Sequence, residues 1–245
     1  MKILGIIPAR YASTRFPAKA LADIAGKSMV QRVYEQARQA GSLHGVVVAT
    51  DHEAIFNHVQ SFGGQVVMTS PDHPSGTDRC FEASQGVGGD YDFLINIQGD
   101  EPFIQPEQID TLASVLSSPG VQLATLVRKI EDAEDLFDPN KVRVILNVFH
   151  EAIYFSRNPI PYVRGAEREA WLQKHTFYQH VGMYAYRPDI LAEITRLPVS
   201  SLEKAESLEQ LRWIENGYRI KTAVTAHESM GIDTPEDLQK VLGRL

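Results

Sequence analysis

A basic segment near the start of the chain has residues that suit phosphate binding. Residues 7–21 read IPARYASTRFPAKAL and place Arg10, Arg15 and Lys19 directly after an apolar run. The small residues between these cations let backbone amides approach a ligand. A triphosphate spreads its charge over many oxygens and needs several positive donors that converge on it. The segment therefore predicts a triphosphate-binding loop, with a solvated basic loop as the alternative.

Two acidic segments suit a divalent cation. In residues 95–104 (INIQGDEPFI), Asp100 and Glu101 directly follow an apolar run, and Gly99 permits a sharp turn out of it. A carboxylate at the carboxyl end of a buried strand can hold Mg²⁺ against phosphate oxygens. A turn that caps the following helix would also explain these residues.

The second acidic segment is residues 231–238 (GIDTPEDL), which contain a helix start. Thr234 is the expected N-cap and Pro235 the first helical residue, and acidic residues in the first turn favour the positive helix end. This pattern leaves Asp233 unexplained. Asp233 is a candidate second metal ligand, and turn chemistry is the alternative.

The elements that must position these residues alternate between strands and helices in the first half of the chain. Such alternation predicts an α/β fold, with a mostly parallel central sheet and helices on both faces. Right-handed crossovers then bring the carboxyl ends of the strands to one edge, where a binding site forms. The expected strands are 2–8, 45–50, 66–69 and 93–98, and the expected helices are 28–40, 52–62, 77–85 and 106–117.

The second half of the chain is less regular. An irregular stretch at 158–175 lies among expected strands, and helical patterns return after it. We therefore expect one domain, residues 1–245, with an inserted substrate or dimerisation lobe at about 140–190. The expected strands are 141–147, 152–155, 181–187 and 219–226, and the expected helices are 188–196, 203–216 and 235–245.

Composition excludes several classes of protein. The 245 residues are 43% hydrophobic and 22% charged, as in an ordinary globular protein. The 24 basic and 31 acidic residues give a net charge of −7, which disfavours binding to nucleic acid. The apolar runs are too short to span a membrane, and the first residues lack a signal-type core, so we expect a cytoplasmic protein without membrane insertion. The single cysteine, Cys80, cannot form an intrachain disulfide.

The basic and acidic segments, in this order, resemble the CTP-dependent nucleotidyltransferases that activate acidic sugars. The match to the 3-deoxy-manno-octulosonate cytidylyltransferases is close and covers essentially the whole chain. This family loop often has Gly and Pro beside the lysine, where this chain has Ala18 and Ala20. The further matching segments are SPDHPSGTDR (70–79), YFSRNPIPY (154–162), HVGMYAYR (180–187) and LEKAESLEQLR (202–212).

The resemblance implies a fold like that of the nucleotide-diphospho-sugar transferases, and a homodimer. It implies a Mg²⁺-dependent reaction of CTP with 3-deoxy-D-manno-octulosonate (Kdo) that gives CMP-Kdo and pyrophosphate. This is the activation step that precedes Kdo transfer into bacterial lipopolysaccharide.

The resemblance also implies roles for individual residues. Arg10, Arg15 and Lys19 would bind the triphosphate, with Arg10, Lys19 and Asp100 catalytic. Asp100 and Asp233 would hold Mg²⁺. The residues expected to border cytosine and ribose are Ser75, Gly76 and Arg79, and those expected to bind Kdo are Gln98, Arg157, His180, Tyr184, Glu209 and Gln210.

Each of these residues has a simpler structural explanation. Ser75 and Gly76 fit a turn with Thr77 as helix cap. Glu209 and Gln210 fit an exposed helix face, Tyr184 a packed strand residue, and His180 a strand-edge residue. Two other functions also fit the sequence. One is a cytidylyltransferase for another acidic sugar or a sugar phosphate, and the other is a non-catalytic nucleotide-binding regulator.

Overall fold

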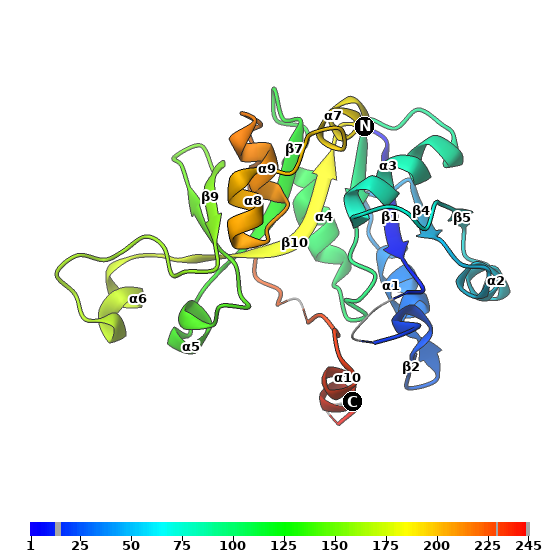
Figure 1. The fold of residues 1–245 in the computed structure, drawn as a ribbon, viewed down its shortest axis with the longest axis horizontal. Coiled ribbons are helices and arrows are strands. Elements are labelled where there is room, and N and C mark those ends of the chain that lie inside the picture. Colours follow the sequence, from blue (N-terminus) through cyan, green and yellow to red (C-terminus); the bar gives the residue numbers. More distant parts are fainter. Residues whose placement is uncertain (13–15, 229, 244–245) are drawn as a thin grey trace. The chain divides into compact units, whose positions relative to one another are not determined.

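A computed structural model gives the positions of residues 1–12, 16–228 and 230–243, and the chain in it divides into two units (Figure 1). The first unit contains Met1–Asp110, Ala185–Thr195 and Ser229–Leu245. The second contains Thr111–Tyr184 and Arg196–Glu228. A single domain with a lobe at about 140–190 stays a prediction.

The first unit contains an all-parallel sheet whose strands are in the order β6-β1-β4-β5. In the centre of the sheet, Ile6 of β1 pairs with Val47 of β4 on one side and with Asn96 of β6 on the other. The strands β1, β4 and β6 are nearly continuous buried apolar runs, as expected where helices cover both faces, whereas β5 is partly exposed. The four expected strands are confirmed, with ends shifted by at most two residues: β1 (Ile3–Ala9), β4 (Gly45–Thr50), β5 (Val66–Met68) and β6 (Phe93–Asn96).

The order of these strands places helices on both faces of the sheet. From β1 through β4 to β5 the chain moves outward, and from β5 it returns past β1 to β6. Because parallel crossovers are right-handed, the helix on the return lies on the opposite face from the two before it. The helices of this unit are α1 (Met29–Ala37), α2 (Glu53–Ser61), α3 (Gly76–Val87), α7 (Pro188–Ile194), α10 (Pro235–Leu242) and most of α4 (Pro106–Ser114).

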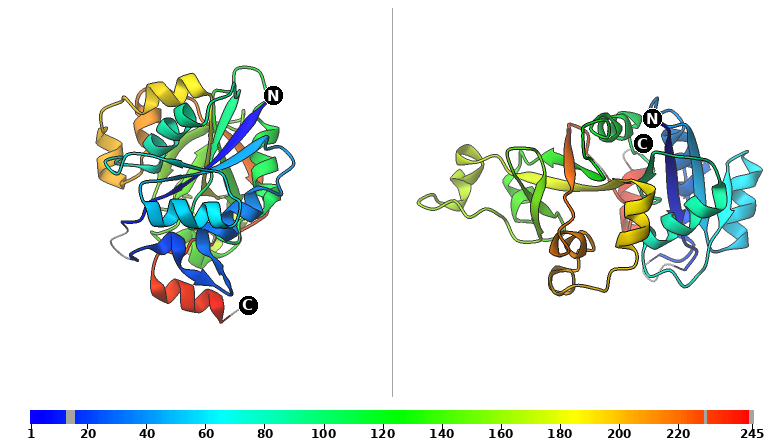
Figure 2. Two further views of the ribbon diagram at one scale, coloured as in Figure 1. Left: turned by 90° about the vertical axis from the view of Figure 1, so that its right-hand side faces the viewer. Right: turned by 90° about the horizontal axis from the view of Figure 1, so that it is seen from above.

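A small apolar cluster brings the end of the chain back to its beginning. Ile232 and Leu238, beside and within α10, pack with Ile24 and Met29. Figure 2 shows α10 beside the short hairpin that contains Ile24. This contact positions Asp233, which follows the fully buried Ile232. The hairpin strands are β2 (Asp23–Ile24) and β3 (Lys27–Ser28), and the 3₁₀ helix η1 (Lys19–Leu21) precedes them.

The second unit has mixed strand directions. β11 runs parallel to β7, and β7 lies beside β10. β8 pairs antiparallel with both β10 and β9. With the parallel sheet of the first unit, the predicted mostly parallel α/β fold is confirmed, although the sequence pattern did not predict β7. The strands are β7 (Leu123–Lys129), β8 (Arg143–Leu146), β9 (Ala152–Ser156), β10 (Tyr178–Tyr186) and β11 (Lys221–Thr225).

The expected single helix at 203–216 is wrong, because two short helices occupy this region. The chain leaves the helical conformation at Ser207, which has φ 53° and ψ 49°. The guanidinium of Arg157 donates to the carbonyls of Glu206 and Ser207 and so satisfies the exposed helix end. The helices of this unit are α5 (Ala133–Phe137), α6 (Trp171–Lys174), α8 (Ser201–Glu206) and α9 (Gln210–Glu215), with the 3₁₀ helix η2 (Arg168–Ala170).

The irregular stretch at 158–175 has its own apolar anchor. Trp171 is buried with Ile130, Leu136 and Phe177, and this cluster holds the stretch against the strands of the second unit. None of the helices within residues 1–12, 16–228 and 230–243 has both the length and the hydropathy needed to cross a bilayer.

Candidate active site

A cavity of about 380 Å³ lies in the first unit, where β1 and β6 end. The chain order reverses between these two neighbouring strands, and open parallel sheets bind ligands at such a point. The volume is in the range of small-molecule sites. The lining residues are Pro8, Ala9, Arg10, Lys19, Ala20, His73, Pro74, Ser75, Gly76, Arg79, Gln98, Gly99, Asp100 and Asp233.

The cavity brings together most of the residues predicted for nucleotide and metal binding. Arg10 lies directly after β1, and Lys19 begins η1. Arg15, the third predicted cation, lies outside the described residues. The other predicted residues on the wall of the cavity are Ser75, Gly76, Arg79, Gln98, Asp100 and Asp233.

One ammonium group joins the two predicted metal ligands. Lys19 Nζ donates to Asp100 Oδ2 at 2.8 Å and to Asp233 Oδ1 at 3.1 Å. The amide of Ile232 donates to the carbonyl of Asp100 at 2.9 Å, which fixes the segment that contains Asp233. Two carboxylates far apart in sequence therefore converge on a single positive charge.

This pair of carboxylates fits the ligand set of Mg²⁺. Protein sites for Mg²⁺ typically supply one or two carboxylates and leave other positions to phosphate and water. Asp100 and Asp233 both approach one cationic group, Lys19 Nζ, and so can share a cation. In the part of the chain that the structure describes, no group of three or more His, Cys, Asp or Glu side chains could hold a metal. A cation held by Asp100 and Asp233 would take its remaining ligands from phosphate oxygens and water.

Close packing explains the glycine before Asp100. A Cβ at Gly99 would lie 2.5 Å from the carbonyl oxygen of Pro8, so any larger residue would push apart the chain segments after β6 and at the end of β1. The sequence predicts this glycine for a sharp turn. The close approach of two segments, and not a positive φ, is what requires it.

The N-terminus of α3 forms another wall of the cavity. Ser75 is its N-cap and accepts from the amides of Thr77 at 3.1 Å and Asp78 at 3.3 Å. The expectation of Thr77 as the cap is therefore wrong, because the cap lies two residues earlier, at Ser75, and the helix begins at Gly76. Helix N-termini carry partial positive charge and free amides, which favour anions.

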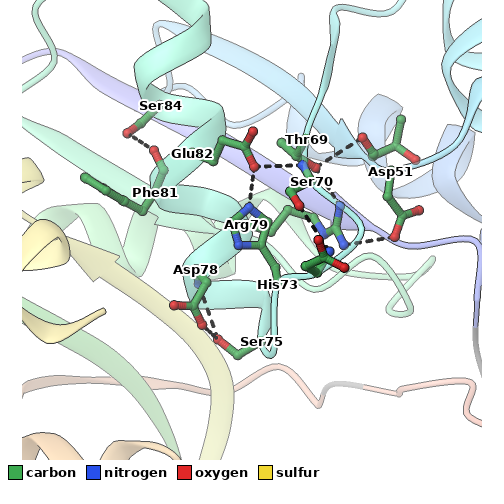
Figure 3. Close-up of polar contacts among 12 residues, drawn as sticks. Asp51, Thr69, Ser70, His73, Ser75, Asp78, Arg79, Phe81, Glu82 and Ser84 are labelled. Atoms are coloured by element: carbon green, nitrogen blue, oxygen red, sulfur yellow. Dashed lines mark hydrogen bonds and ion pairs between the residues drawn. The ribbon is translucent and has the colours of Figure 1, made fainter. Parts of the chain in front are cut away.

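Arg79 forms the buried side of this wall (Figure 3). It is 3% exposed and donates through Nη2 to Asp51 Oδ2 at 2.9 Å and through Nη1 to Thr69 Oγ1 at 2.5 Å. Both terminal guanidinium nitrogens thus bind protein groups. Arg79 lines the cavity with its side chain held in one orientation.

His73 lines the cavity but received no role in the sequence analysis. Its ring contacts the carboxylate of Glu82, which also accepts from the amide of Ser70 at 2.8 Å (Figure 3). The hydrogen bond from this amide is the largest cause that lowers the pKa of Glu82, and His73 contributes less. Glu82 thereby ties the loop before α3 to the helix itself. The sequence could have indicated this position, because His73 lies two residues before Ser75 within residues 70–79, a segment that resembles the family.

The six residues predicted to bind Kdo are divided between the two units. Gln98 lines the cavity of the first unit, and the other five lie in the second. Of these five, His180 and Tyr184 of β10 have ring centroids 5.2 Å apart. Trp213 of α9 contacts the Tyr184 ring at 5.0 Å, so α9 packs against this part of β10.

His180 is held as a neutral imidazole. Its Nε2 lies 2.9 Å from Thr125 Oγ1, and that hydroxyl donates to the carbonyl of Met183 at 2.7 Å. The hydroxyl has one proton, so it accepts from His180, and Nε2 carries the imidazole proton. Burial lowers the pKa of His180 to about 3. His180 can therefore donate or accept a hydrogen bond near neutral pH but does not supply a charge.

The remaining predicted residues of the second unit lie around the ends of α8 and α9. Gln210 is 5% exposed, so the prediction that it lies on an exposed helix face is wrong. Glu209, which directly precedes α9, is half-buried. Arg157 donates through Nε to the carbonyl of Glu206 at 2.8 Å, and its own amide donates to Glu206 Oε2 at 2.9 Å. Tyr184 lies on β10 and is buried, which agrees with the alternative explanation that it is a packed strand residue.

Comparison with known proteins places the chain in a family. The model of the family described as "Cytidylyltransferase" matches residues 4–221. The chain is 62% identical to the 3-deoxy-manno-octulosonate cytidylyltransferase of Cytophaga hutchinsonii, over 98% of this chain and 96% of the relative. It is 49% identical to the enzyme of the same name from Geobacter sulfurreducens, over 100% of both.

Solved structures agree with these relatives. A structure of CMP:2-keto-3-deoxy-manno-octonic acid synthetase complexed with CTP superposes with a TM-score of 0.91 at 43% identity, covering 100% of this chain and 98% of that one. The 4-diphosphocytidyl-2C-methyl-D-erythritol synthase of Anaerococcus prevotii gives a TM-score of 0.63 at 11% identity, covering 99% of this chain and 97% of that one, and so shares the fold alone. The chain therefore belongs to the cytidylyltransferase family, together with the 3-deoxy-manno-octulosonate cytidylyltransferases.

Proposed function

We propose that this protein is an enzyme that transfers CMP from CTP to the anomeric hydroxyl of Kdo and releases pyrophosphate. The observation that carries the proposal is the convergence of Lys19, Asp100 and Asp233 in a cavity that Arg10 also lines. The full-length relatives named for this activity, and a similar synthetase complexed with CTP, support it.

CTP binds in the cavity at the ends of β1 and β6. Arg10 and Lys19, with Arg15, neutralise the triphosphate from more than one direction. The N-terminus of α3 adds backbone amides beside Ser75 and Gly76. The volume of about 380 Å³ suits a nucleotide that remains partly open to solvent, where the second substrate can approach.

Asp100 and Asp233 hold Mg²⁺ in this proposal. When bound, the metal supplies positive charge that polarises the α-phosphate of the nucleotide. Lys19 would then release at least part of its contact with the two carboxylates. Its ammonium group is then available to phosphate oxygens.

The reaction is an in-line displacement at the α-phosphorus. The anomeric oxygen of Kdo forms a new bond to that phosphorus, and the bond from the α-phosphorus to the oxygen that bridges it to the β-phosphate breaks. Pyrophosphate carries away the electron pair of that bond, while the hydroxyl proton is lost to solvent. Arg10 and Lys19 stabilise the charge that develops on the phosphate oxygens, which is where most of the rate enhancement arises.

Kdo is a carboxylated polyol, and its site needs a cation and several hydrogen-bonding groups. Arg157 supplies the cation in this proposal. His180 contributes a neutral imidazole, consistent with its lowered pKa. The other proposed ligands of the second unit are Tyr184, Glu209 and Gln210. Gln98 of the first unit is proposed from the family resemblance alone.

We also propose a homodimer in the cytoplasm that supplies CMP-Kdo for lipopolysaccharide synthesis. Apolar side chains are exposed on the second unit and support an association surface there. Val148 is 88% exposed, Phe149 68% and Ile153 51%. Val148 and Phe149 follow β8, and Ile153 lies on the paired strand β9.

A screen of acceptors tests the proposed substrate. The purified protein is incubated with CTP and Mg²⁺ and with Kdo, a sialic acid or a sugar 1-phosphate, and the products are identified by mass. We expect a CMP-sugar with Kdo alone. A product with another acceptor would replace Kdo as the substrate, and binding of CTP without any product would indicate a nucleotide-binding regulator.

A further inference from the structure

We propose that Asp51 is a positioning residue for the triphosphate-binding loop. The proposal rests on the proposed function, because it takes the triphosphate of CTP as the ligand of that loop. Asp51 directly follows β4 and does not line the cavity. It acts through Tyr11 and Arg79, which it joins.

The carboxylate of Asp51 uses its two oxygens for two different segments. Oδ1 accepts from the backbone amide of Tyr11 at 2.9 Å, and Oδ2 accepts from Arg79 Nη2 at 2.9 Å. The side chain of Asp51 is 9% exposed and that of Arg79 4%, so the pair is shielded from water. Asp51 therefore ties the residue after Arg10 to α3. Figure 3 shows the contact of Asp51 with Arg79.

The Arg79 side of this link is rigid. Nη1 of Arg79 donates to Thr69 Oγ1, and that hydroxyl donates in turn to the carbonyl of Thr50 at 3.1 Å. The guanidinium thus connects α3 with the ends of β5 and β4. The guanidinium that pairs with Asp51 is therefore held in place by its other contacts.

The Tyr11 side of the link extends to Lys19. The amide of Ala18 donates to the carbonyl of Tyr11 at 3.1 Å, so the two ends of the loop are closed on each other. Ala18 directly precedes Lys19. By holding Tyr11, Asp51 fixes the chain beside both Arg10 and Lys19, the two cations of this loop that line the cavity in the described part of the chain.

A second contact holds the same tyrosine. The ring of Tyr11 stacks on the ring of His52, with centroids 3.8 Å apart and planes 13° apart. His52 is also the N-cap of α2, where Nδ1 accepts from the amide of Ala54 at 3.1 Å. Consecutive residues at the end of β4 therefore hold the backbone and the ring of Tyr11.

Positioning and electrostatics predict opposite effects of removing Asp51. Loss of a negative charge near the cavity strengthens triphosphate binding if charge alone matters. Loss of an anchor weakens it, because the loop must then be ordered when the ligand binds. CMP lacks the β- and γ-phosphates and depends less on the loop, so the ratio of the Kd values for CTP and CMP isolates the effect.

Isothermal titration of CTP and of CMP into the full chain tests the proposal. We expect Asp51→Ala to weaken CTP binding about tenfold and CMP binding less than about threefold. Asp51→Asn keeps an oxygen that can accept from Tyr11, and we expect it to weaken CTP binding only about threefold. The control is Asp92→Ala, because Asp92 accepts from the amide of Lys2 at 2.6 Å, just before β1, and should leave both affinities within about twofold.

A second variant keeps the test decisive if Asp51→Ala does not fold. His52→Asn retains a helix-capping side chain and the Asp51–Arg79 pair but removes the ring that stacks on Tyr11. We expect it to weaken CTP binding about threefold with CMP binding unchanged. Equal or tighter CTP binding in the folded variants would overturn the role of Asp51. Failure of the unaltered protein to bind CTP would instead contradict the proposed function.

Discussion

Lys19 forms ion pairs with both carboxylates of the cavity. Its ammonium group contacts Asp100 and Asp233, and its side chain is only 16% exposed. The two carboxylates repel each other less when a cation lies between them. In the proposed reaction Asp100 and Asp233 would hold Mg²⁺, and the ammonium group of Lys19 would contact phosphate oxygens. The contact found in the structure shows that the two carboxylates lie close enough to share one cationic group.

Asp100→Asn tests this interpretation at the level of one side chain. The amide keeps the shape of the carboxylate but loses the charge that binds Mg²⁺, so we expect turnover to fall by about two to three orders of magnitude with folding intact. Pyrophosphate release measures turnover, and circular dichroism checks the fold. Glu101→Gln, one residue further along, is the matched control and should keep near-normal turnover. Near-normal turnover in Asp100→Asn would defeat the metal assignment.

His180 gives the protein a predictable dependence on pH. Burial lowers its pKa to about 3, whereas an unfolded chain binds a proton at about 6.5. Between pH 6.5 and 3 this imidazole binds a proton in the unfolded state but not in the folded state. The free energy of unfolding therefore decreases as the pH falls from about 6.5 towards 3. For this one group the unfolding equilibrium shifts by up to about tenfold per pH unit.

The His180→Gln variant removes this titration and retains a side chain that can donate to Thr125. We expect its Tm to fall less steeply between pH 7 and about pH 4.5 than that of the unaltered protein. His227→Gln, at an exposed position, is the control and should keep the original slope. Parallel Tm curves for His180→Gln and the unaltered protein would show that His180 is not held neutral.

At the scale of elements, the sequence predicts the first unit well because its signals are local. Each strand is an apolar run bounded by polar or glycine residues, and Thr234 is the helix cap expected from its position. The sequence pattern does not predict β7. Its buried run, Leu123–Val127, is too short and too uniform for a strand to be distinguished from a helix. The pattern also fails at Ser207, where Arg157, which follows the distant strand β9, satisfies the helix end.

The candidate site shows the same division between local and distant signals. Arg10, Lys19 and Asp100 could be predicted because each lies directly beside a recognisable strand or matched segment. The contacts of Arg79 with Asp51 and Thr69 could not be predicted, since they depend on which side of the sheet α3 occupies. The role of Lys19 as a bridge also depends on the packing of α10, which brings Asp233 to Asp100.

The turn into η1 provides a test of loop energetics. Ala18 has φ 53°, a left-handed conformation that costs an L-residue free energy and that glycine adopts freely. We expect Ala18→Gly to raise the free energy of unfolding by roughly 0.5–1 kcal/mol, measured by urea denaturation. Ala20→Gly, at a buried position in η1, should lower it by a similar amount. Destabilisation by Ala18→Gly would show that the chain does not adopt this turn.

At the scale of the whole molecule, net charge and local charge answer different questions. The total of −7 disfavours nucleic acid as a partner. It does not exclude a small polyanion such as CTP, because Arg10 and Lys19 act within one cavity. The molecule can remain acidic overall and still present converging cations to one nucleotide.

The exposed apolar residues of the second unit lead to a prediction about assembly. We expect the unaltered protein to have twice the mass of the chain by light scattering after size-exclusion chromatography. Phe149→Ser removes a large exposed apolar side chain and should shift the protein towards the monomer. Met68→Ser is the control, because Met68 is 43% exposed on β5 of the first unit. A dimer that survives Phe149→Ser and dissociates with Met68→Ser would place the interface elsewhere.

The most direct test of the central claim is pyrophosphate release by the purified protein with CTP, Mg²⁺ and Kdo. We predict release when all three are present, with one CMP-Kdo formed for each pyrophosphate, and no release when Kdo or Mg²⁺ is left out. If CTP binds but no pyrophosphate appears with Kdo, the cavity binds a nucleotide without transferring it, and the account is wrong.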